Sequence, residues 1–404
     1  MEYDGKIVLI ERDGRKSKKR NRVIAVALIA AVLITFLATS LYYRSKYEPL
    51  LPLAQAMKLV ESNYYFYDEE ENDVLTAALR GIAANIGDDY AQYFTEEEYA
   101  QHTQSNSGNY IGIGIMVMYE DAGVFRITDV FSDTPASEAG ILAGDRLMAI
   151  DGVYADEDST LTDFLNLMPN VDGAVYSLLI LRDGVELTFE VEMREVYSPY
   201  VHYEMLEGNV GYILLTGFQG RCVAEMEAAL EELTALGMEK LVLDLRDNLG
   251  GSLSSVVDIA GMFLDKGSVI TTVRTRTDSE EVYKTDTEGM SIPIALLVND
   301  YSASASELLA GALHDHGVAR LFGITTYGKG IVQSYFELVG DNGYLKFTTD
   351  AYYTPNGVCI QGTGIEPDVV VELDEKYATT SIGLIPHEED AQLQAALQYL
   401  MELN

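Results

Sequence analysis

The stretch from Val23 to Tyr43 constrains this chain more than any other, because VIAVALIAAVLITFLATSLYY carries no charged residue. A helix needs about 20 apolar residues to cross the hydrocarbon core of a bilayer, so this run is long enough for an uncleaved membrane anchor. The alternative is a cleaved signal peptide, whose apolar part is usually shorter, roughly 7–15 residues. The sequence Ala38-Thr39-Ser40 would permit such a cleavage. We favour the anchor.

Residues 1–22 are polar and basic, and we expect a short, mostly unstructured tail. Their positive charges are concentrated between residues 12 and 22, at Arg12, Arg15, Lys16, Lys18, Lys19, Arg20 and Arg22. Basic flanks of membrane helices stay in the cytoplasm. The prediction is therefore a cytoplasmic tail over 1–22, a single-pass anchor over 23–43, and everything after Tyr43 on the extracytoplasmic side of the cell membrane.

The chain as a whole is acidic, with 64 Asp and Glu against 27 Lys and Arg. This acidic balance argues against nucleic acid as a partner, because phosphate binding needs clustered positive charge. Five histidines without an HExxH motif or a Cys/His cluster argue against a zinc site, and we expect no cofactor.

Cys222 and Cys359 have no metal-ligand spacing, and a disulfide between them cannot be deduced. Small buried hydrophobes are the preferred interpretation.

Residues 44–106 are predicted to be a helical segment. Apolar residues recur at helical spacing in two stripes, Leu53, Ala56, Met57 and Val60, then Val74, Ala77, Ala78, Ile82 and Ile86. Asn72 or Asp73 is the expected N-cap of the second helix. Such stripes are usually core or helix-pairing faces, and we predict no chemistry in this segment.

Residues 107–192 change to the alternating pattern of paired strands, with a turn near Asp121-Ala122-Gly123 and a hairpin turn at Asp183-Gly184. Two short helices are expected, after Pro135 and around Leu161–Met168. The segment resembles a PDZ domain of the bacterial protease type. The resemblance rests on the loop Ile111, Gly112, Ile113 and Gly114, on Pro135 to Gly140, and on Gly144-Asp145 followed by Asp151-Gly152.

The glycines of the Ile111–Gly114 loop suggest a peptide-binding site. Glycine lets backbone N–H groups converge on an anion, so a terminal carboxylate can bind there while the peptide adds a strand to the sheet edge. The alternative is an ordinary strand that ends in a glycine bulge.

From residue 193 the pattern alternates between apolar strands and amphipathic helices, which predicts a largely parallel sheet with crossover helices. KLVLDLRDNLGG reads as a strand buried on both faces, and IPIALLVND as a strand that leads into a serine cluster. The expected α/β core spans 193–376. A C-terminal helical tail over 377–404, amphipathic from Glu388, is a candidate partner contact.

The junction between Val298 and Glu307 is the first candidate site. A strand ends, three serines alternate with alanines, and a helix begins. A serine at a helix start can attack a carbonyl while a neighbouring N–H holds the oxyanion, although serine there is most often only an N-cap. The nucleophile also needs a base. His314 and His316 lie more than two turns along the same helix, pointing away from its start.

Lys329 is the better base, since it lies in a glycine-flanked turn. Burial can lower a lysine pKa by up to about 3–5 units, which removes most of the roughly 4.6 kcal/mol needed to neutralise it at pH 7. Gln333 could accept a hydrogen bond from the amine; an ordinary surface glutamine is the alternative. Gly250 or Gly251 could provide an oxyanion donor at the end of a buried strand, or merely form a turn.

Residues 193–373 are similar to the C-terminal processing peptidases, also called tail-specific proteases. The motifs that carry this resemblance are DLRDNLGG, SASASE, GALHDHG, TTYGKGIVQ and TPNG followed by GTGIEPD. The resemblance implies a Ser-Lys dyad of Ser304 and Lys329, with Gln333 in support. It also implies oxyanion donors at Ala305 and at Gly250 or Gly251, and a supporting role for Asp315.

Three positions depart from the family pattern. Leu249 stands where the family commonly has proline, so we expect a looser oxyanion loop; Ile324 replaces a common glutamate, and Val358-Cys359 a more polar pair. None removes an expected catalytic residue.

The prediction is a membrane-anchored serine endopeptidase that captures unstructured, apolar C-termini and works through an acyl-enzyme. The alternative is a catalytically inactive PDZ-containing scaffold. Homo-oligomers through the terminal helices are also predicted. The substrate, and whether PDZ binding gates the site, stay open.

Overall fold

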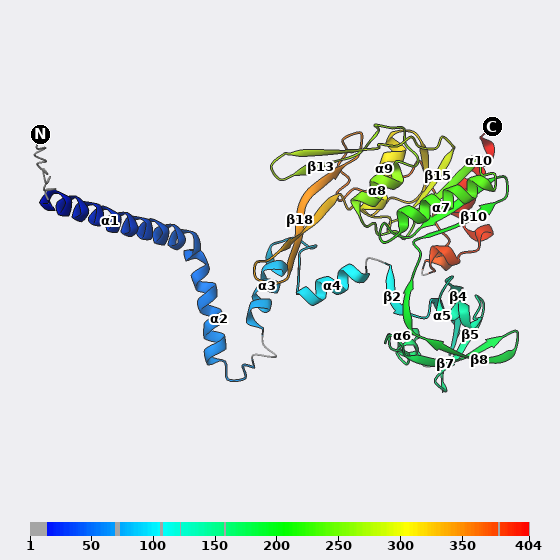
Figure 1. The fold of residues 1–404 in the computed structure, drawn as a ribbon. Coiled ribbons are helices and arrows are strands. Elements are labelled where there is room, and N and C mark those ends of the chain that lie inside the picture. Colours follow the sequence, from blue (N-terminus) through cyan, green and yellow to red (C-terminus); the bar gives the residue numbers. More distant parts are fainter. Residues whose placement is uncertain are drawn as a thin grey trace, which may run out of the picture. The chain divides into compact units, whose positions relative to one another are not determined.

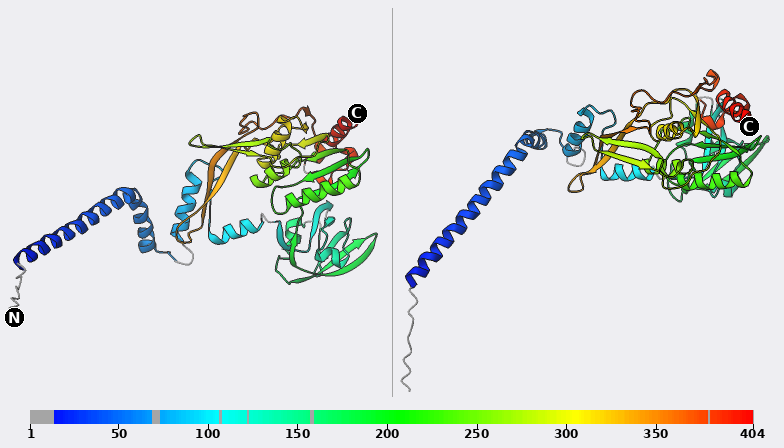
Figure 2. Two further views of the ribbon diagram at one scale, coloured as in Figure 1. Left: turned by 45° about the horizontal axis from the view of Figure 1, so that its top comes forward. Right: turned by 90° about the horizontal axis from the view of Figure 1, so that it is seen from above.

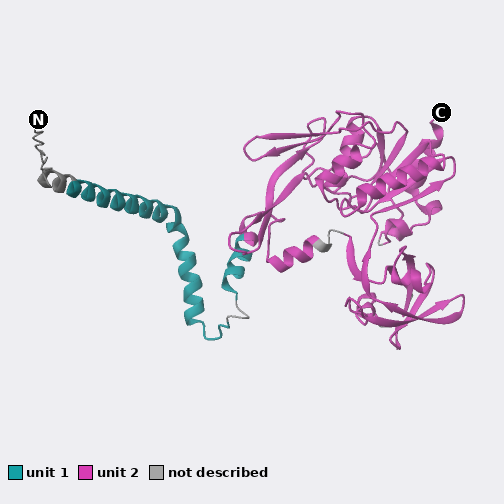
Figure 3. Cartoon of the chain, viewed as in Figure 1, with its two compact units in different colours: residues 1–82 teal, residues 83–404 magenta. Residues whose placement is uncertain are grey.

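The computed structural model describes residues 14–68, 73–105, 108–121, 123–156, 159–378 and 380–403. The chain divides into two compact units, Met1–Ile82 and Ala83–Asn404 (Figure 3). This boundary falls inside the predicted helical segment 44–106, so its last part belongs to the second unit. Asn72, Ala122 and most of the predicted basic tail lie outside the described residues.

The first unit is helical (Figure 1). Its elements are α1 (Gly14–Tyr47), η1 (Glu48–Leu50), α2 (Leu51–Asn63) and the start of α3 (Val74–Asn85). Within the described residues, Asn21–Asn63 is the one helical stretch long and apolar enough to cross a membrane, a test that a signal sequence also passes. No residue of α2 is buried, so the first predicted stripe is not a core face of this chain. The N-cap prediction is confirmed at Asp73, whose Oδ1 accepts from the N–H of Thr76 at 2.9 Å.

In the second unit, a small β-rich domain follows α4 (Glu96–Ser105). Its elements are β2 (Asn109–Gly112), β3 (Ile115–Asp121), β4 (Val124–Val130), α5 (Pro135–Ala139), β5 (Arg146–Ile150), β6 (Val153–Tyr154), α6 (Leu161–Leu165), β7 (Val175–Arg182), β8 (Val185–Glu192) and β9 (Arg194–Tyr197). The main sheet has the order β3-β4-β5-β7-β8, which leaves β3 at an edge. Both predicted helices are present, and the β7–β8 turn falls at Asp183-Gly184, where both residues have positive φ.

The larger domain is built on a six-stranded sheet with the order β10-β11-β12-β15-β16-β19. The strands are β10 (Val201–Leu206), β11 (Val210–Leu215), β12 (Lys240–Asp244), β15 (Ile294–Val298), β16 (Ala319–Gly323) and β19 (Val369–Val370). Only the β10–β11 pair is antiparallel. The predicted largely parallel sheet is therefore confirmed.

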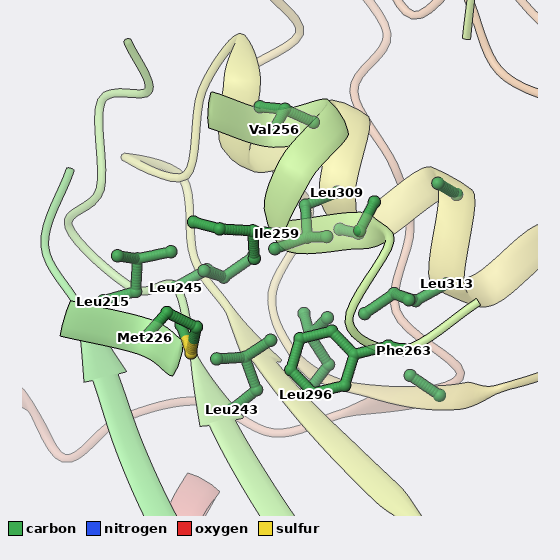
Figure 4. Close-up of a cluster of buried hydrophobic side chains, with 14 of the residues drawn as sticks. Leu215, Met226, Leu243, Leu245, Val256, Ile259, Phe263, Leu296, Leu309 and Leu313 are labelled. Carbon is green, nitrogen blue, oxygen red and sulfur yellow. The ribbon is translucent and has the colours of Figure 1, made fainter. Parts of the chain in front are cut away.

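Helices cover both faces of this sheet. On one face pack α7 (Cys222–Ala235), α8 (Leu253–Ala260) and α9 (Ala305–Asp315). Figure 4 shows this cluster, in which leucines of neighbouring strands meet side chains of the three helices. Successive strand residues point to opposite faces, so Leu241 and Leu243 join this cluster while Val242 joins the cluster on the other face. This alternation explains why the strands are apolar throughout.

The opposite face is covered by α10 (Ala391–Glu402). Its apolar residues Leu393, Ala396 and Leu400 are fully buried. This stripe is therefore not available to a partner, and the predicted partner contact of the tail stays a prediction. The stripe completes the core of its own chain, as an amphipathic helix does wherever a sheet face is open to it.

A second, antiparallel sheet was not predicted as such. It has the order β1-β18-β13-β14, with β17 also paired to β18. Its strands are β1 (Gln92–Phe94), β13 (Val269–Thr275), β14 (Glu280–Lys284), β17 (Ile331–Glu337) and β18 (Tyr344–Tyr353). Figure 2 shows the long strand β18 in orange beside β13. Because β1 pairs with β18, the segment from Asp88 to Phe94 lies against this second sheet. Tyr90 of that segment lies close to Lys329.

Candidate active site

The three serines at the β15–α9 junction have different surroundings. The hydroxyl of Ser302 donates to the carbonyl of Leu245 at 2.8 Å, and that of Ser306 donates to the carbonyl of Asn248 at 2.7 Å. Both are fully buried structural groups. Ser304, between them, lines an open cavity of about 770 Å³, here called the Ser304 cavity. Of the three, Ser304 is the one with a hydroxyl placed to meet a ligand.

The backbone of Ser304 has a conformation that non-glycine residues rarely adopt, with φ 56° and ψ −112°. Such strain costs about 1–3 kcal/mol and persists only where the surroundings fix it. Here the residue is fixed from both sides. Its N–H donates to Glu307 Oε2 at 2.8 Å, and its carbonyl accepts from the N–H of Leu308 at 3.0 Å. The sharp turn presents Ser304 at the head of α9, where helical N–H groups are unpaired.

Glu307 connects Ser304 to the lysine loop. Its carboxylate is fully buried and accepts four hydrogen bonds, each of 2.6–2.8 Å. The donors are the backbone N–H of Ser304, the hydroxyl of Thr326, and the backbone N–H groups of Gly328 and Lys329. Ser304 and Lys329 share the same oxygen, Oε2, so their two backbone nitrogens lie within twice 2.8 Å of each other.

Lys329 is half-buried and lines the same cavity. Burial lowers its pKa, the neighbouring ammonium of Lys346 lowers it further, and the carboxylate of Glu307 partly opposes both effects. Its Nζ lies over the ring of Tyr90, 4.6 Å from the ring centre. Among the hydrogen bonds of the described residues, none joins this amine to the hydroxyl of Ser304. The fold brings the two residues to one cavity, with the amine resting on an aromatic face.

The loop after β12 forms another wall of the Ser304 cavity. Asn248 is fully buried; its Nδ2 donates to the carbonyl of Leu215, and its Oδ1 accepts from the N–H of Gly250 at 2.9 Å. Gly250 therefore does not have a free N–H. Its lack of a side chain matters instead, because a Cβ there would lie 2.8 Å from the backbone nitrogen of Ala305.

Of the two predicted glycine donors, Gly251 is the one whose N–H is not used in any hydrogen bond recorded among the described residues. The same holds for the N–H of Ala305, which is the first residue of α9. Leu249 is two-thirds exposed at the cavity wall. The hydrogen bonds that Asn248 makes to Leu215 and Gly250 nevertheless hold this loop in place.

The two remaining predicted residues, Gln333 and Asp315, lie in different places and have different hydrogen-bond partners. Gln333 lines the Ser304 cavity, and its amide nitrogen lies 3.4 Å from Thr348 Oγ1; in the described part of the chain it makes no hydrogen bond to Lys329. Asp315 accepts from the N–H of Asn356 at 2.9 Å, which ties the end of α9 to the turn at Pro355–Gly357.

The two histidines point to other partners. His314 Nε2 lies 3.3 Å from Asp368 Oδ1, and His316 Nε2 lies 2.8 Å from the carbonyl of Val269. Both are at the far end of α9, whose 11 residues span roughly 16 Å. This geometry leaves neither in a position to act on Ser304.

Several residues of this site were missed by sequence reasoning. Glu307 had a signal, because Ser304 and Glu307 form the Ser-x-x-Glu pattern of a capping box. Tyr90 had none: it belongs to the segment 44–106, for which no chemistry was predicted, and its ring lies against the amine of Lys329. Outside the cavity, Arg246 is fully buried and binds Asp244 and Asp390 through charge-assisted hydrogen bonds, which connect the end of β12 to the N-cap of α10.

The predicted peptide-binding loop lies at the start of the edge strand β3. Gly114 has φ 81°, and a Cβ there would collide with Thr134, so the loop requires glycine. The carbonyls of Ile113 and Gly114 accept from Ala136 and Phe131. Ile115 and Val117 of β3 pack in the same apolar cluster as Leu161 and Leu165 of α6, which places an apolar face beside the open strand edge.

Two regions of the chain match known families. Residues 209–371 match Peptidase family S41, and residues 110–193 match the PDZ domain. The carboxy-terminal-processing protease of Bartonella bacilliformis is 33% identical over 352 residues, which are 84% of this chain and 80% of that protein. The chain belongs to peptidase family S41. Within the family it is a serine protease of the carboxy-terminal-processing type with a PDZ domain.

Other members of family S41 show the same relationship. A probable CtpA-like serine protease of Staphylococcus epidermidis is 30% identical over 374 residues, covering 90% of this chain and 74% of that protein. A crystal structure from Bacteroides fragilis, provisionally named an S41 protease, is 18% identical with a TM-score of 0.56, and the match covers 84% of this chain and 92% of that chain. At that identity the structure shows the shared fold alone.

Proposed function

We propose that this S41 peptidase is a membrane-anchored, extracytoplasmic serine endopeptidase that uses Ser304 as nucleophile and Lys329 as base. The observation that carries the proposal is the shared oxygen of Glu307, which holds the backbones of both residues together at one cavity. The strained backbone of Ser304 and the lowered pKa of Lys329 are typical of an activated nucleophile and its base.

The reaction would proceed in two halves. The neutral Lys329 amine takes the proton from Ser304 Oγ as that oxygen attacks the peptide carbonyl. The N–H groups of Ala305 and Gly251 stabilise the oxyanion. The resulting ammonium then gives its proton to the leaving amine, which departs and leaves an acyl-enzyme. Water attacks the ester with Lys329 again as base, and Ser304 is restored. For the first step the Lys329 amine must move from the ring of Tyr90 toward Ser304.

Substrate delivery is assigned to the PDZ domain. An unstructured C-terminus can add a strand to the free edge of β3 while its carboxylate meets the Ile111–Gly114 loop and its apolar side chains meet the β3–α6 face. The apolar helix of the first unit supplies the membrane anchor, with the basic flank in the cytoplasm. The competing proposal is an inactive PDZ scaffold, which the intact Ser304 and Lys329 disfavour.

A cleavage assay with the full chain in detergent tests this function. The substrate is a denatured protein that ends in an apolar tail, and its control is the same protein ending in a charged tail. We expect fragments from the first and at least about tenfold slower cleavage of the second, because apolar burial of one large side chain contributes about 1.5–3 kcal/mol to binding. An enzyme that cuts neither substrate at any pH would favour the scaffold, and equal rates on both would remove the role given to the PDZ domain.

The pH dependence of kcat/KM should report Lys329. Only the neutral amine can act as base, so activity should rise with pH through the pKa of Lys329 and then level off. That midpoint should lie below the ordinary lysine value of 10.5, because burial lowers this pKa. In Lys346→Met the midpoint should move to higher pH, since a positive charge that favours the neutral amine is lost. A profile that follows a histidine pKa and ignores Lys346→Met would contradict the assignment.

A further inference from the structure

The Ser304 cavity has an electrostatic character opposite to that of the whole chain. The chain has a formal net charge of −37. Yet the charged side chains among the described residues that line this cavity are two lysines, Lys329 and Lys346, with no aspartate or glutamate beside them. Lys329 is accounted for by the proposed reaction. Lys346 is a second cation that takes no part in the bond-making or proton-transfer steps of that reaction.

Lys346 is held at the cavity by the second sheet. It lies on β18 directly opposite Tyr335 of β17, and Gln333, Tyr335 and Lys346 all line the cavity. Because side chains two apart on a strand share a face, Gln333 and Tyr335 lie on one face of β17, with Lys346 beside Tyr335 on the neighbouring strand. The Nζ of Lys346 lies 5.4 Å from the centre of the Phe94 ring, so β1 limits its movement.

The ammonium of Lys346 has little compensation within the protein. Its recorded hydrogen bond is a long one, 3.4 Å, to Gln92 Oε1. In the part of the chain that the structure describes, no carboxylate lies within 4.0 Å of it. Asp88 exerts a favourable charge effect from farther away, but its oxygens already accept from Thr348 and Tyr90. Burial lowers the pKa of Lys346, as expected of a cation without a close counter-ion.

We propose that Lys346 is a substrate-binding residue that holds a carboxylate of the peptide in the Ser304 cavity. A half-buried, weakly paired ammonium beside a nucleophile is a ready partner for an anionic group, and a charge-assisted hydrogen bond between them is the strong kind. The carboxylate can come from an acidic side chain near the scissile bond or from the free C-terminus of a short tail. This inference rests on the proposed peptidase function and deepens it, because it names a charge preference at the cleavage site itself.

Matched peptide pairs test the proposal on the full chain in detergent. In the first arm, peptides with an amidated C-terminus carry Glu or Gln at each of the positions flanking the cleaved bond. In the second arm, a peptide with neutral side chains has either a free or an amidated C-terminus. The quantity compared is the ratio of kcat/KM within each pair, measured for the wild type, Lys346→Met, Lys346→Arg and Lys284→Met. Lys284 is an exposed lysine on β14 of the same sheet and serves as the control.

The wild type should prefer the carboxylate member of at least one pair by about tenfold, the usual size of a hydrogen bond to a charged group. Lys346→Met should bring that ratio close to one, while Lys346→Arg and Lys284→Met keep it. The arm in which the preference appears identifies the source of the carboxylate. Any effect of Lys346 on the pKa of Lys329 cancels, because both members of a pair meet the same enzyme.

The proposal is overturned if the wild type shows ratios near one in both arms, or if Lys346→Met leaves the preference intact. Binding of the same pairs to Ser304→Ala gives a second measurement that needs no turnover. If the wild type cleaves nothing, the proposed function fails, and a carboxylate preference in binding that disappears in Ser304→Ala/Lys346→Met still supports Lys346 as an anion site. If cleavage depends on Ser304 but no preference appears, the peptidase stands and the role of Lys346 does not.

Discussion

Replacing Ser304 by alanine should lower kcat by at least about 10⁴-fold, the scale on which loss of a nucleophile acts in serine proteases. Lys329→Met should cost a comparable factor, because without the amine the hydroxyl keeps its proton. The two residues act as one unit, so the double variant should be no slower than the worse single variant. The measurement is turnover of a tail-bearing substrate by the full chain, with circular dichroism to verify that each variant is folded.

The control for this prediction uses the two histidines of α9. His314→Ala and His316→Ala should retain cleavage, because their rings contact Asp368 and the carbonyl of Val269 at the far end of the helix. If His316→Ala is inactive while Lys329→Met remains active, the base is His316 and not Lys329. That result would contradict the Ser-Lys proposal. Unchanged cleavage in Ser304→Ala would place the reaction at another site altogether.

Glu307→Ala should affect both stability and activity. The buried carboxylate accepts four hydrogen bonds, and each donor left without a partner costs about 1–3 kcal/mol. We expect the free energy of unfolding to fall by at least about 3 kcal/mol, and kcat to fall about 10²-fold or more, because displacement of a catalytic group by about 1 Å can have that effect. Chemical denaturation and the cleavage assay measure the two quantities.

Glu307→Gln separates the charge of this side chain from its shape. An amide presents an NH₂ group where the protein offers only donors, so at least one of the four hydrogen bonds must be lost. Activity should therefore fall in Glu307→Gln as well, with a smaller loss of stability than in Glu307→Ala. The matched control is Glu337→Gln, an exposed position on β17, which should change neither quantity. Full activity in a folded Glu307→Gln would show that this carboxylate does not position the dyad.

Much of the architecture was accessible from the sequence because it is encoded between near neighbours. Apolar strands followed by amphipathic helices predicted the largely parallel sheet. Asp183-Gly184 predicted a hairpin turn, and Asp73 predicted a helix cap. In each case a few adjacent residues decide the local backbone. Motif spacing brought Ser304 and Lys329 into one prediction, and the fold places both at one cavity.

Other features arise where distant segments meet, and local patterns do not encode them. The amphipathic tail helix α10 turns its apolar stripe inward, with Leu393 and Leu400 buried against the sheet. Gly250 was a candidate oxyanion donor, but its N–H is engaged by Asn248. No pattern around Tyr90 indicates that it lies against the amine of Lys329. These facts depend on packing between segments that the chain places far apart in sequence.

The amino-acid sequence by itself determined the apolar helix, the two domain types, and the serine and lysine that we propose for the reaction, since each is written in local patterns of polarity and small residues. Only the tertiary structure decided what surrounds that pair. Pairing of β1 with β18 brings the segment of Tyr90 to the amine of Lys329. Pairing of β17 with β18 places Lys346 beside Tyr335 at the cavity wall. The buried carboxylate of Glu307 joins the helix to the lysine loop. The physical reason is that burial and charge at a site are sums over every segment that packs there.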